Sequence, residues 1–206
     1  MNPVLSSHEL VPTQQQGGQS NTTHTVKTES QKEARALYQS AKTRLLDVNH
    51  WKDISGRQSA VFTLNDSHGH FVRRLAREGD LIRISIPGPD AADGQEYDWV
   101  KVERIFETTT HRNSSAYTGM RVRPVKAPEK MPAEVSHFFK NTATSSFIVE
   151  KRGKIVSAGV YGRNEQPNTT PRSFLGALRN VVVWLGALLG LSKVQWKSLV
   201  RGLLRE

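Results

Sequence analysis

The sequence has 206 residues and corresponds to one domain, or to one domain with tails. It contains no cysteine, which excludes disulfides, thiolate zinc sites, haem attachment and thiol nucleophiles. The formal net charge of +10 favours an acidic partner, such as nucleic acid, an anionic membrane surface or an acidic protein. The first residues contain no basic cluster followed by an apolar run, so we expect a cytoplasmic protein without a secretory signal.

Residues 1–29 are polar, with a low-complexity run of glutamine, glycine and serine at 14–20. Such a stretch buries too little apolar surface to offset the entropy lost on ordering. We therefore predict a disordered leader over 1–29 and a single domain over 30–206.

A helix is predicted over 30–48. Ser30 followed by Glu33 is a capping-box pattern, in which the two side chains satisfy free backbone N–H groups. Apolar side chains then recur at helical spacing, namely Ala34, Leu37, Tyr38, Ala41, Leu45 and Val48.

Between residues 59 and 125 the apolar period changes to two, which is typical of strands with one buried and one solvated face. Turn-forming residues at 65–69 and 87–90 separate these strands. The predicted strands are 60–64, 71–75, 81–86, 98–106 and 117–125.

Prolines space an extended connector over 124–132, and a short helix is predicted over 133–140. A β-hairpin over 145–161 follows, because two alternating segments flank Lys151, Arg152, Gly153 and Lys154. We expect these basic residues to form the tip of the hairpin.

Helices are predicted over 173–205. Residues 174–191 are strongly apolar, and their uninterrupted run from Val181 is too short to span a bilayer of about 30 Å. We interpret this segment as a core helix, with membrane association as the alternative. Residues 192–205 then form an amphipathic helix with one apolar face and a basic stripe.

Together these elements predict the α+β class: a curved antiparallel sheet of five to seven short strands, an N-terminal helix, and a long apolar C-terminal helical segment packed on the sheet. This layout resembles that of helix-grip or lipocalin-like ligand binders. The resemblance is one of arrangement and rests on no family motif, so it implies no activity.

Two surfaces are candidates for binding. Basic side chains on the last helix and on the solvated sheet face are predicted to contact an anionic partner: Lys193, Lys197, Arg201, Arg205, Arg121 and Arg123. Polar side chains at the end of the hairpin's second strand are possible ligand contacts: Tyr161, Arg163, Asn164 and Glu165. An arginine there can hold an anion, and a glutamate can act as a base.

No catalytic, nucleotide-binding or cofactor-binding motif is present, and we predict no catalytic residue and no cofactor. Asp66, His68 and His70 have a spacing compatible with metal binding, but a polar hairpin turn explains them better, so we predict no metal site.

The leading hypothesis is a non-enzymatic interaction module that contacts an anionic partner. The first alternative is a small-molecule binder or hydrolase with a cavity between sheet and C-terminal helix. The second is a protein associated with a membrane through 174–191.

Overall fold

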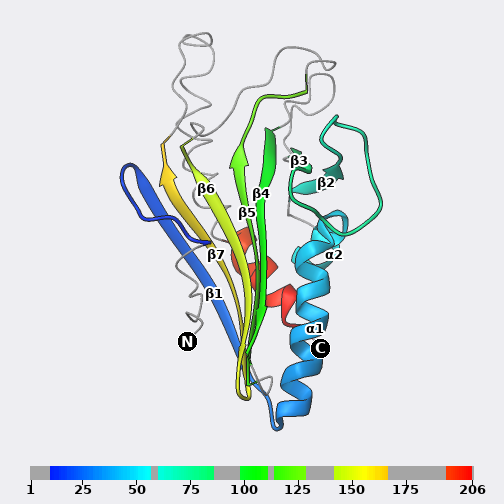
Figure 1. The fold of residues 1–206 in the computed structure, drawn as a ribbon, viewed down its shortest axis with the longest axis vertical. Helices are drawn as coiled ribbons and strands as arrows, with labels where there is room; N and C mark the ends of the chain where they lie inside the picture. Colours follow the sequence, from blue (N-terminus) through cyan, green and yellow to red (C-terminus); the bar gives the residue numbers. More distant parts are fainter. Residues whose placement is uncertain are drawn as a thin grey trace.

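The computed structural model describes residues 10–56, 60–85, 98–110, 114–128, 142–166 and 194–205. In these residues the chain forms one curved antiparallel sheet with helices packed against it (Figure 1). The seven strands follow the order β1-β7-β6-β5-β4-β3-β2, so that β1 and β2 lie at opposite edges. The predicted α+β class and antiparallel sheet are confirmed.

The elements have the following bounds. The strands are β1 (Gly18–Lys27), β2 (Val61–Asn65), β3 (Leu81–Ser85), β4 (Asp98–Thr109), β5 (Ser115–Pro124), β6 (Thr144–Arg152) and β7 (Ile155–Glu165). The helices are α1 (Gln31–Leu46), the 3-10 turn η2 (Val48–His50), α2 (Trp51–Ser55) and a last helix over 194–203, drawn in red in Figure 1. We call the sheet face that carries α1 and the last helix the inner face, and the opposite one the outer face.

The first helix begins as the capping box predicts. The Glu33 amide donates to Ser30 Oγ at 3.2 Å, and the Glu33 carboxylate accepts the amide of Glu29 at 3.1 Å. The predicted apolar stripe is buried, and it packs on the inner face against β5, β6 and β7.

The prediction of a disordered leader is wrong from Leu10 onward. Residues 18–27 form β1, which pairs with β7 along its length apart from one irregularity at 18–20. The preceding segment also has fixed contacts, since Leu10 is buried on the outer face against Tyr117 and Ile148. The backbone ladder with β7 orders this polar strand, and composition carries no signal of such pairing. Residues 1–9 lie outside the described residues.

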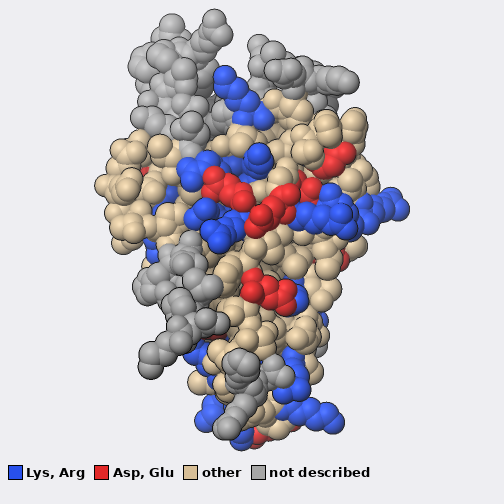
Figure 2. All heavy atoms as spheres, in the orientation of Figure 1, with Lys and Arg blue, Asp and Glu red and all other residues tan. Residues whose placement is uncertain are grey.

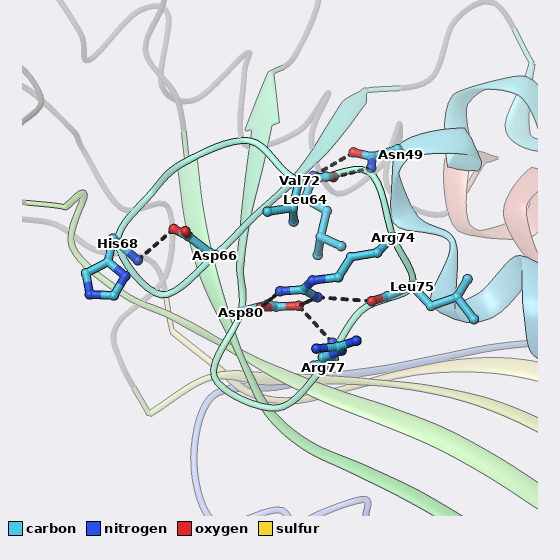
Figure 3. Close-up of polar contacts among 9 residues, drawn as sticks. All are labelled: Asn49, Leu64, Asp66, His68, Val72, Arg74, Leu75, Arg77 and Asp80. Atoms are coloured by element: carbon cyan, nitrogen blue, oxygen red, sulfur yellow. Dashed lines mark hydrogen bonds and ion pairs between the residues drawn. The ribbon is translucent and has the colours of Figure 1, made fainter.

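Residues 66–80 form an extended loop, where a return strand was predicted over 71–75 (Figure 3). Only an isolated bridge joins Asn65 to Phe71. The Asn49 side chain connects the loop to β2, because it accepts the Leu64 amide at 2.8 Å and donates to the Val72 carbonyl at 2.9 Å. These side-chain bonds supplement two backbone bonds, from the Val72 amide to the Leu64 carbonyl at 3.0 Å and from the Asp66 amide to the His70 carbonyl at 2.8 Å.

The buried carboxylate of Asp80 anchors the far end of this loop. It accepts hydrogen bonds from Nη1 and Nη2 of Arg74 and from the backbone amide of Arg77 (Figure 3). The backbone of Asp80 also accepts the amide of Val102 at 2.8 Å. The loop is therefore tied to β4 as well as to β2.

The hairpin of β6 and β7 is confirmed, but its tip is shorter than predicted. Only Gly153 and Lys154 connect the strands, with Gly153 at a φ of 59° that favours glycine. Arg152 closes β6, and Lys151 belongs to β6 with a side chain only 2% exposed. Lys151 is thus an inner-face residue, which corrects the expectation that it lies at a solvated tip.

The last helix packs its predicted apolar face into the core. Leu199, Val200, Leu203 and Leu204 are buried, and Trp196 is half-buried. The long apolar helical segment predicted over 174–191 lies outside the described residues. No helix in the described parts of the chain has both the length and the apolar character needed to cross a membrane.

Candidate ligand-binding site

Four aromatic side chains meet on the inner face. The ring of Trp51 lies 5.1 Å from that of Phe62 and 4.7 Å from that of Phe147, measured between centroids. Trp196 lies 6.1 Å from Phe62 and 5.5 Å from Phe147. Pairs at these distances are favourable beyond the area they bury, so the cluster contributes to the stability of the core.

Each ring comes from a different element. Trp51 opens α2, and its indole Nε1 donates to the carbonyls of Arg44 and Leu45 at 3.1 and 3.2 Å. These carbonyls belong to the last turn of α1, where no helical N–H can reach them. Phe62 and Phe147 are inner-face positions of β2 and β6. Trp196 comes from the last helix.

The position of the last helix is fixed by a close backbone approach. A Cβ at Gly202 would lie 2.1 Å from the carbonyl oxygen of Ile54, so only glycine fits between this helix and α2. The Arg44 guanidinium donates to the carbonyl of Leu203 at 3.1 Å and to that of Arg205. A cation at this helix end also opposes the negative end of the helix dipole.

An apolar cavity of about 50 Å³ lies beside the aromatic cluster. It is bounded by α2, by inner-face side chains of five strands and by the last helix. The lining residues are Trp51, Phe62, Ile82, Ile84, Val100, Val122, Ser145, Phe147 and Trp196. Among the described lining residues, Ser145 supplies the single hydroxyl, and none of them is charged. Such a site can hold a small apolar group and offer it one hydrogen bond.

The cavity is small compared with known ligand sites. An engineered cavity of about 150 Å³ binds benzene, so a ligand of that size can bind here only if a lining side chain moves aside. Trp196 is the wall residue best placed to do so, because it is half-buried and comes from the last helix. Side-chain rotations of this kind are common when ligands bind.

The predicted ligand contacts at the end of β7 lie away from this cavity. The Arg163 guanidinium donates to the Ser20 carbonyl and to Asn21 Oδ1, and Asn164 Oδ1 accepts the amides of Gln15 and Gln16. Their polar groups hold β1 and the preceding segment to β7. A part in ligand binding stays a prediction for these residues.

The other two members of that group are also engaged in contacts within the protein. Tyr161 packs with the outer-face cluster of Leu10 and Tyr117. Glu165 accepts the hydroxyl of Ser20 at 3.1 Å, and burial raises the pKa of its carboxyl above the ordinary value. Burial likewise raises the pKa of Tyr161. Tyr161 thus stabilises the outer face, whereas Glu165 supports the pairing of β1 with β7.

The predicted basic residues divide into two groups. Arg121 and Arg123 both bind the carboxylate of Glu103, at a bulge in β4 where the register shifts between 102 and 104. Lys197, Arg201 and Arg205 are exposed on the last helix. Lys193 lies outside the described residues. The face drawn in Figure 2 carries basic and acidic side chains next to one another across its middle.

The histidines of the β2–β3 loop belong to a polar turn. Asp66 Oδ1 accepts the amides of His68 and His70, each at 2.9 Å, and these bonds lower the pKa of the Asp66 carboxyl. No group of three or more potential metal ligands occurs in the residues that the structure describes.

Comparisons with known proteins identify no family. No family model matches the sequence, and no curated protein matches it. Several solved structures match it at low similarity. Major latex-like protein 151 of Panax ginseng is 12% identical with a TM-score of 0.39, over 91% of this chain and 97% of that one.

Two further structures are comparable. The KanY protein is 10% identical with a TM-score of 0.43, over 91% of this chain and 99% of that one. Norcoclaurine synthase of Thalictrum flavum is 10% identical with a TM-score of 0.39, over 97% and 100% of the two chains. All of these TM-scores are below 0.5, so the fold description rests on the strand order of this chain.

Sequence reasoning found the members of the aromatic cluster separately but missed their convergence. Trp196 lies in the segment predicted as an amphipathic helix, and Trp51 lies between the predicted helix and the first predicted strand. Phe62 and Phe147 lie in segments predicted as strands. The available signal was that each of these segments carries one large aromatic residue on its apolar face.

Proposed function

We propose that this protein binds a small apolar molecule in the cavity between the inner sheet face and the last helix. The observation that supports the proposal is an unfilled space beside four clustered aromatic rings. Protein interiors are ordinarily packed to the density of organic crystals. An apolar gap in the most aromatic part of the core is therefore a candidate binding site.

The chemistry of the lining defines the ligand class. A lining of aliphatic and aromatic side chains gives a charged ligand nothing to offset the loss of its hydration. Ser145 Oγ can accept or donate one hydrogen bond, which suits a ligand with a single carbonyl or hydroxyl. The ligand enters by displacement of the Trp196 side chain.

Thermal unfolding in the presence of benzene or indole, with tryptophan emission as a second readout, tests the proposal. Binding raises the unfolding temperature, because a ligand that binds only the folded state stabilises it. It also changes the emission, since Trp51 and Trp196 both line the cavity. If neither probe shifts the unfolding temperature or the emission, the proposal is wrong.

A matched pair of variants locates the binding. Val122→Ile adds one methylene to a lining residue and should weaken the effect of both probes. Val149→Ile makes the same change at a buried residue outside the lining and should leave it intact. Equal losses in the two variants would place the probes elsewhere.

A second candidate function is binding to an anionic partner through the last helix. The observation in its favour is the exposure of Lys197 and Arg201 on the side of the helix turned away from the core. Cosedimentation with phosphatidylserine vesicles, and separately with double-stranded DNA, should then occur at low salt and decline as salt rises.

Charge reversal at two positions provides the control for this second function. Lys197→Glu with Arg201→Glu should abolish the sedimentation. The same change at Lys32 and Lys52, which are exposed on α1 and α2, should reduce it only slightly. Absence of binding to both partners at low salt would refute this candidate.

A further inference from the structure

The two edge strands of the sheet, β1 and β2, differ in how the chain covers them (Figure 1). At the β2 edge, the amide of Leu64 donates to Asn49 Oδ1 at 2.8 Å, and its carbonyl accepts the amide of Val72 at 3.0 Å. The loop over 66–80 thus occupies this edge, which is one way in which proteins prevent further strands from pairing there.

The pairing of β1 with β7 determines which backbone groups of β1 face outward. The Thr28 amide donates at 2.9 Å to the carbonyl of Lys154, which lies opposite it when the β1–β7 register is continued. In an antiparallel pair, residues bonded in this way alternate with residues whose amide and carbonyl point away from the partner strand. The outward-facing residues are therefore Asn21, Thr23, Thr25 and Lys27. Among the described residues, no further group bonds to their amides or carbonyls.

The free part of β1 lacks the features that ordinarily protect an edge strand. Such features are a proline, a bulge, a charge in the middle of the strand or a very short strand. Residues 20–27 pair with β7 in regular register, and they contain no proline. Lys27 is at the end of the strand, and the side chains at 21, 23, 25 and 27 are exposed. An edge of this kind is a template for another strand.

The sequence of this edge is complementary to itself. When two copies of β1 pair antiparallel about a two-fold axis at Thr23, that residue lies opposite its own counterpart, and Asn21 lies opposite Thr25. Three residues of each copy then form hydrogen-bonded pairs, with about six backbone bonds in total. Lys27 falls opposite Gln19, so no like charges are opposed, and threonine pairs across strands are favourable.

The chemistry of the edge favours a second copy over an unrelated peptide. Where an added strand is recognised specifically, pockets beside the edge receive its alternate side chains. The exposed side chains of β1 are short and polar, and neither a pocket nor a cluster of charge lies along them in the described residues. The match of the strand with itself is therefore the property that can select a partner.

We propose that β1 is an interaction surface for a second copy of this chain, so that two sheets join into one continuous antiparallel sheet. The interface consists mainly of backbone hydrogen bonds and threonine contacts. It is therefore weak, with a dissociation constant on the order of 10–100 µM. This surface is separate from the apolar cavity, and the proposal does not depend on the proposed ligand.

Sedimentation velocity of the full chain tests the proposal, at about 0.15 M salt to screen the repulsion between two basic copies. The concentration should span about 5 to 500 µM, on both sides of the expected dissociation constant. The average mass should rise with concentration from the 23.1 kDa of one chain towards twice that value. A single monomeric species at every concentration would overturn the proposal.

The two-fold axis allows a sharper test at Thr23. Thr23→Lys and Thr23→Glu should each weaken self-association by about tenfold or more, because each places like charges directly opposite one another. An equimolar mixture of the two variants should associate again, because opposite charges then meet at the axis. If the mixture remains monomeric where the natural chain associates, the register is wrong and the proposal is overturned.

Thr109 provides the matched control, since it is exposed on β4 and lies away from both edges of the sheet. Thr109→Lys and Thr109→Glu change the net charge by the same amounts and should associate like the natural chain. Equal losses at the two positions would show an effect of net charge and contradict the proposal.

Thr23→Pro gives an independent decision should the charged variants fail to fold. It removes an outward amide and leaves the bonds between β1 and β7 in place, as proline does on edge strands. Self-association should again fall by about tenfold or more, because the proline also obstructs the approach of the second strand. Unchanged self-association in Thr23→Pro would refute pairing at this edge.

Discussion

The same substitution, valine to isoleucine, should stabilise this protein at one buried position and destabilise it at another. Val122 is 4% exposed and lines the apolar cavity, so Val122→Ile places its extra carbon in empty space. Val149 is fully buried and does not line this cavity, so Val149→Ile must displace its neighbours.

The magnitudes follow from the size of the cavity. At about 24 cal/mol per Å³, an unfilled space of about 50 Å³ costs about 1.2 kcal/mol. Burying one methylene contributes about 0.8 kcal/mol. We therefore expect Val122→Ile to raise the free energy of unfolding by about 0.5–1 kcal/mol. Overpacking at Val149 should lower it by about 1–3 kcal/mol.

Urea denaturation followed by tryptophan emission measures both changes. The slope of the free energy against urea should stay constant, so that the midpoint alone carries the difference. The opposite signs are the decisive feature, because the two substitutions are chemically identical. Destabilisation of similar size in both variants would show that the space beside Val122 is already filled.

Three further predictions concern the supports of the site. Gly202→Ala should destabilise by about 2 kcal/mol despite the better helix propensity of alanine, because its Cβ would clash with the Ile54 carbonyl. Chemical denaturation measures this, and a stabilised variant would contradict the close approach. Asp80→Ala should cost about 2 kcal/mol, since it removes the partner of a partly exposed Arg74. Proteolysis of the 66–80 loop should accelerate, and unchanged cleavage would argue against the anchor. The third prediction concerns pH. Burial raises the pKa of Glu165 above its ordinary 4.5 in the folded state, so the folded protein holds this proton more tightly and loses stability as pH rises through that range. Glu165→Gln should flatten this part of the profile in urea titrations at pH 4 to 7, and an unchanged slope would refute the assignment.

The local elements of the fold could be predicted because their signals are local. The capping box of Ser30 and Glu33, the helical stripe that follows it and the glycine of the β6–β7 turn each act within a few residues. All three are found where the sequence places them. The amphipathic last helix also buries its predicted face, because apolar side chains at helical spacing lie on one side of a helix and can pack together against the core.

The errors arose where distant contacts decide the structure. β1 is polar and owes its order to pairing with β7, some 140 residues away along the chain. The alternating residues 71–75 read as a strand, but the Asn49 side chain and the Asp80 carboxylate hold them as a loop. Lys151 is predicted at the tip of the hairpin, but it belongs to β6, where strand alternation turns it toward α1.

The candidate sites were beyond prediction for a related reason. A cavity forms where the side chains of neighbouring elements leave space, and these helices and strands come together only in the complete fold. The Ser145 of the hairpin and the Trp196 of the last helix illustrate the point, since they share one cavity but are separated by about 50 residues. The net charge of the whole chain suggests that surface arginines bind an anionic partner. Arg121 and Arg123, however, both form ion pairs with Glu103.

The two faces of the sheet are used differently, and this argues for placing function on the inner one. On the outer face, Leu10 covers Tyr117 and Ile148 so closely that a Cβ at Gly119 would lie 2.2 Å from the Leu10 side chain. The segment before β1 thus fills the space over the central strands and fastens itself to β7 through Asn164. In the described residues, the outer face is covered by this segment and the apolar cavity lies on the inner face, which is why the proposed ligand is placed there.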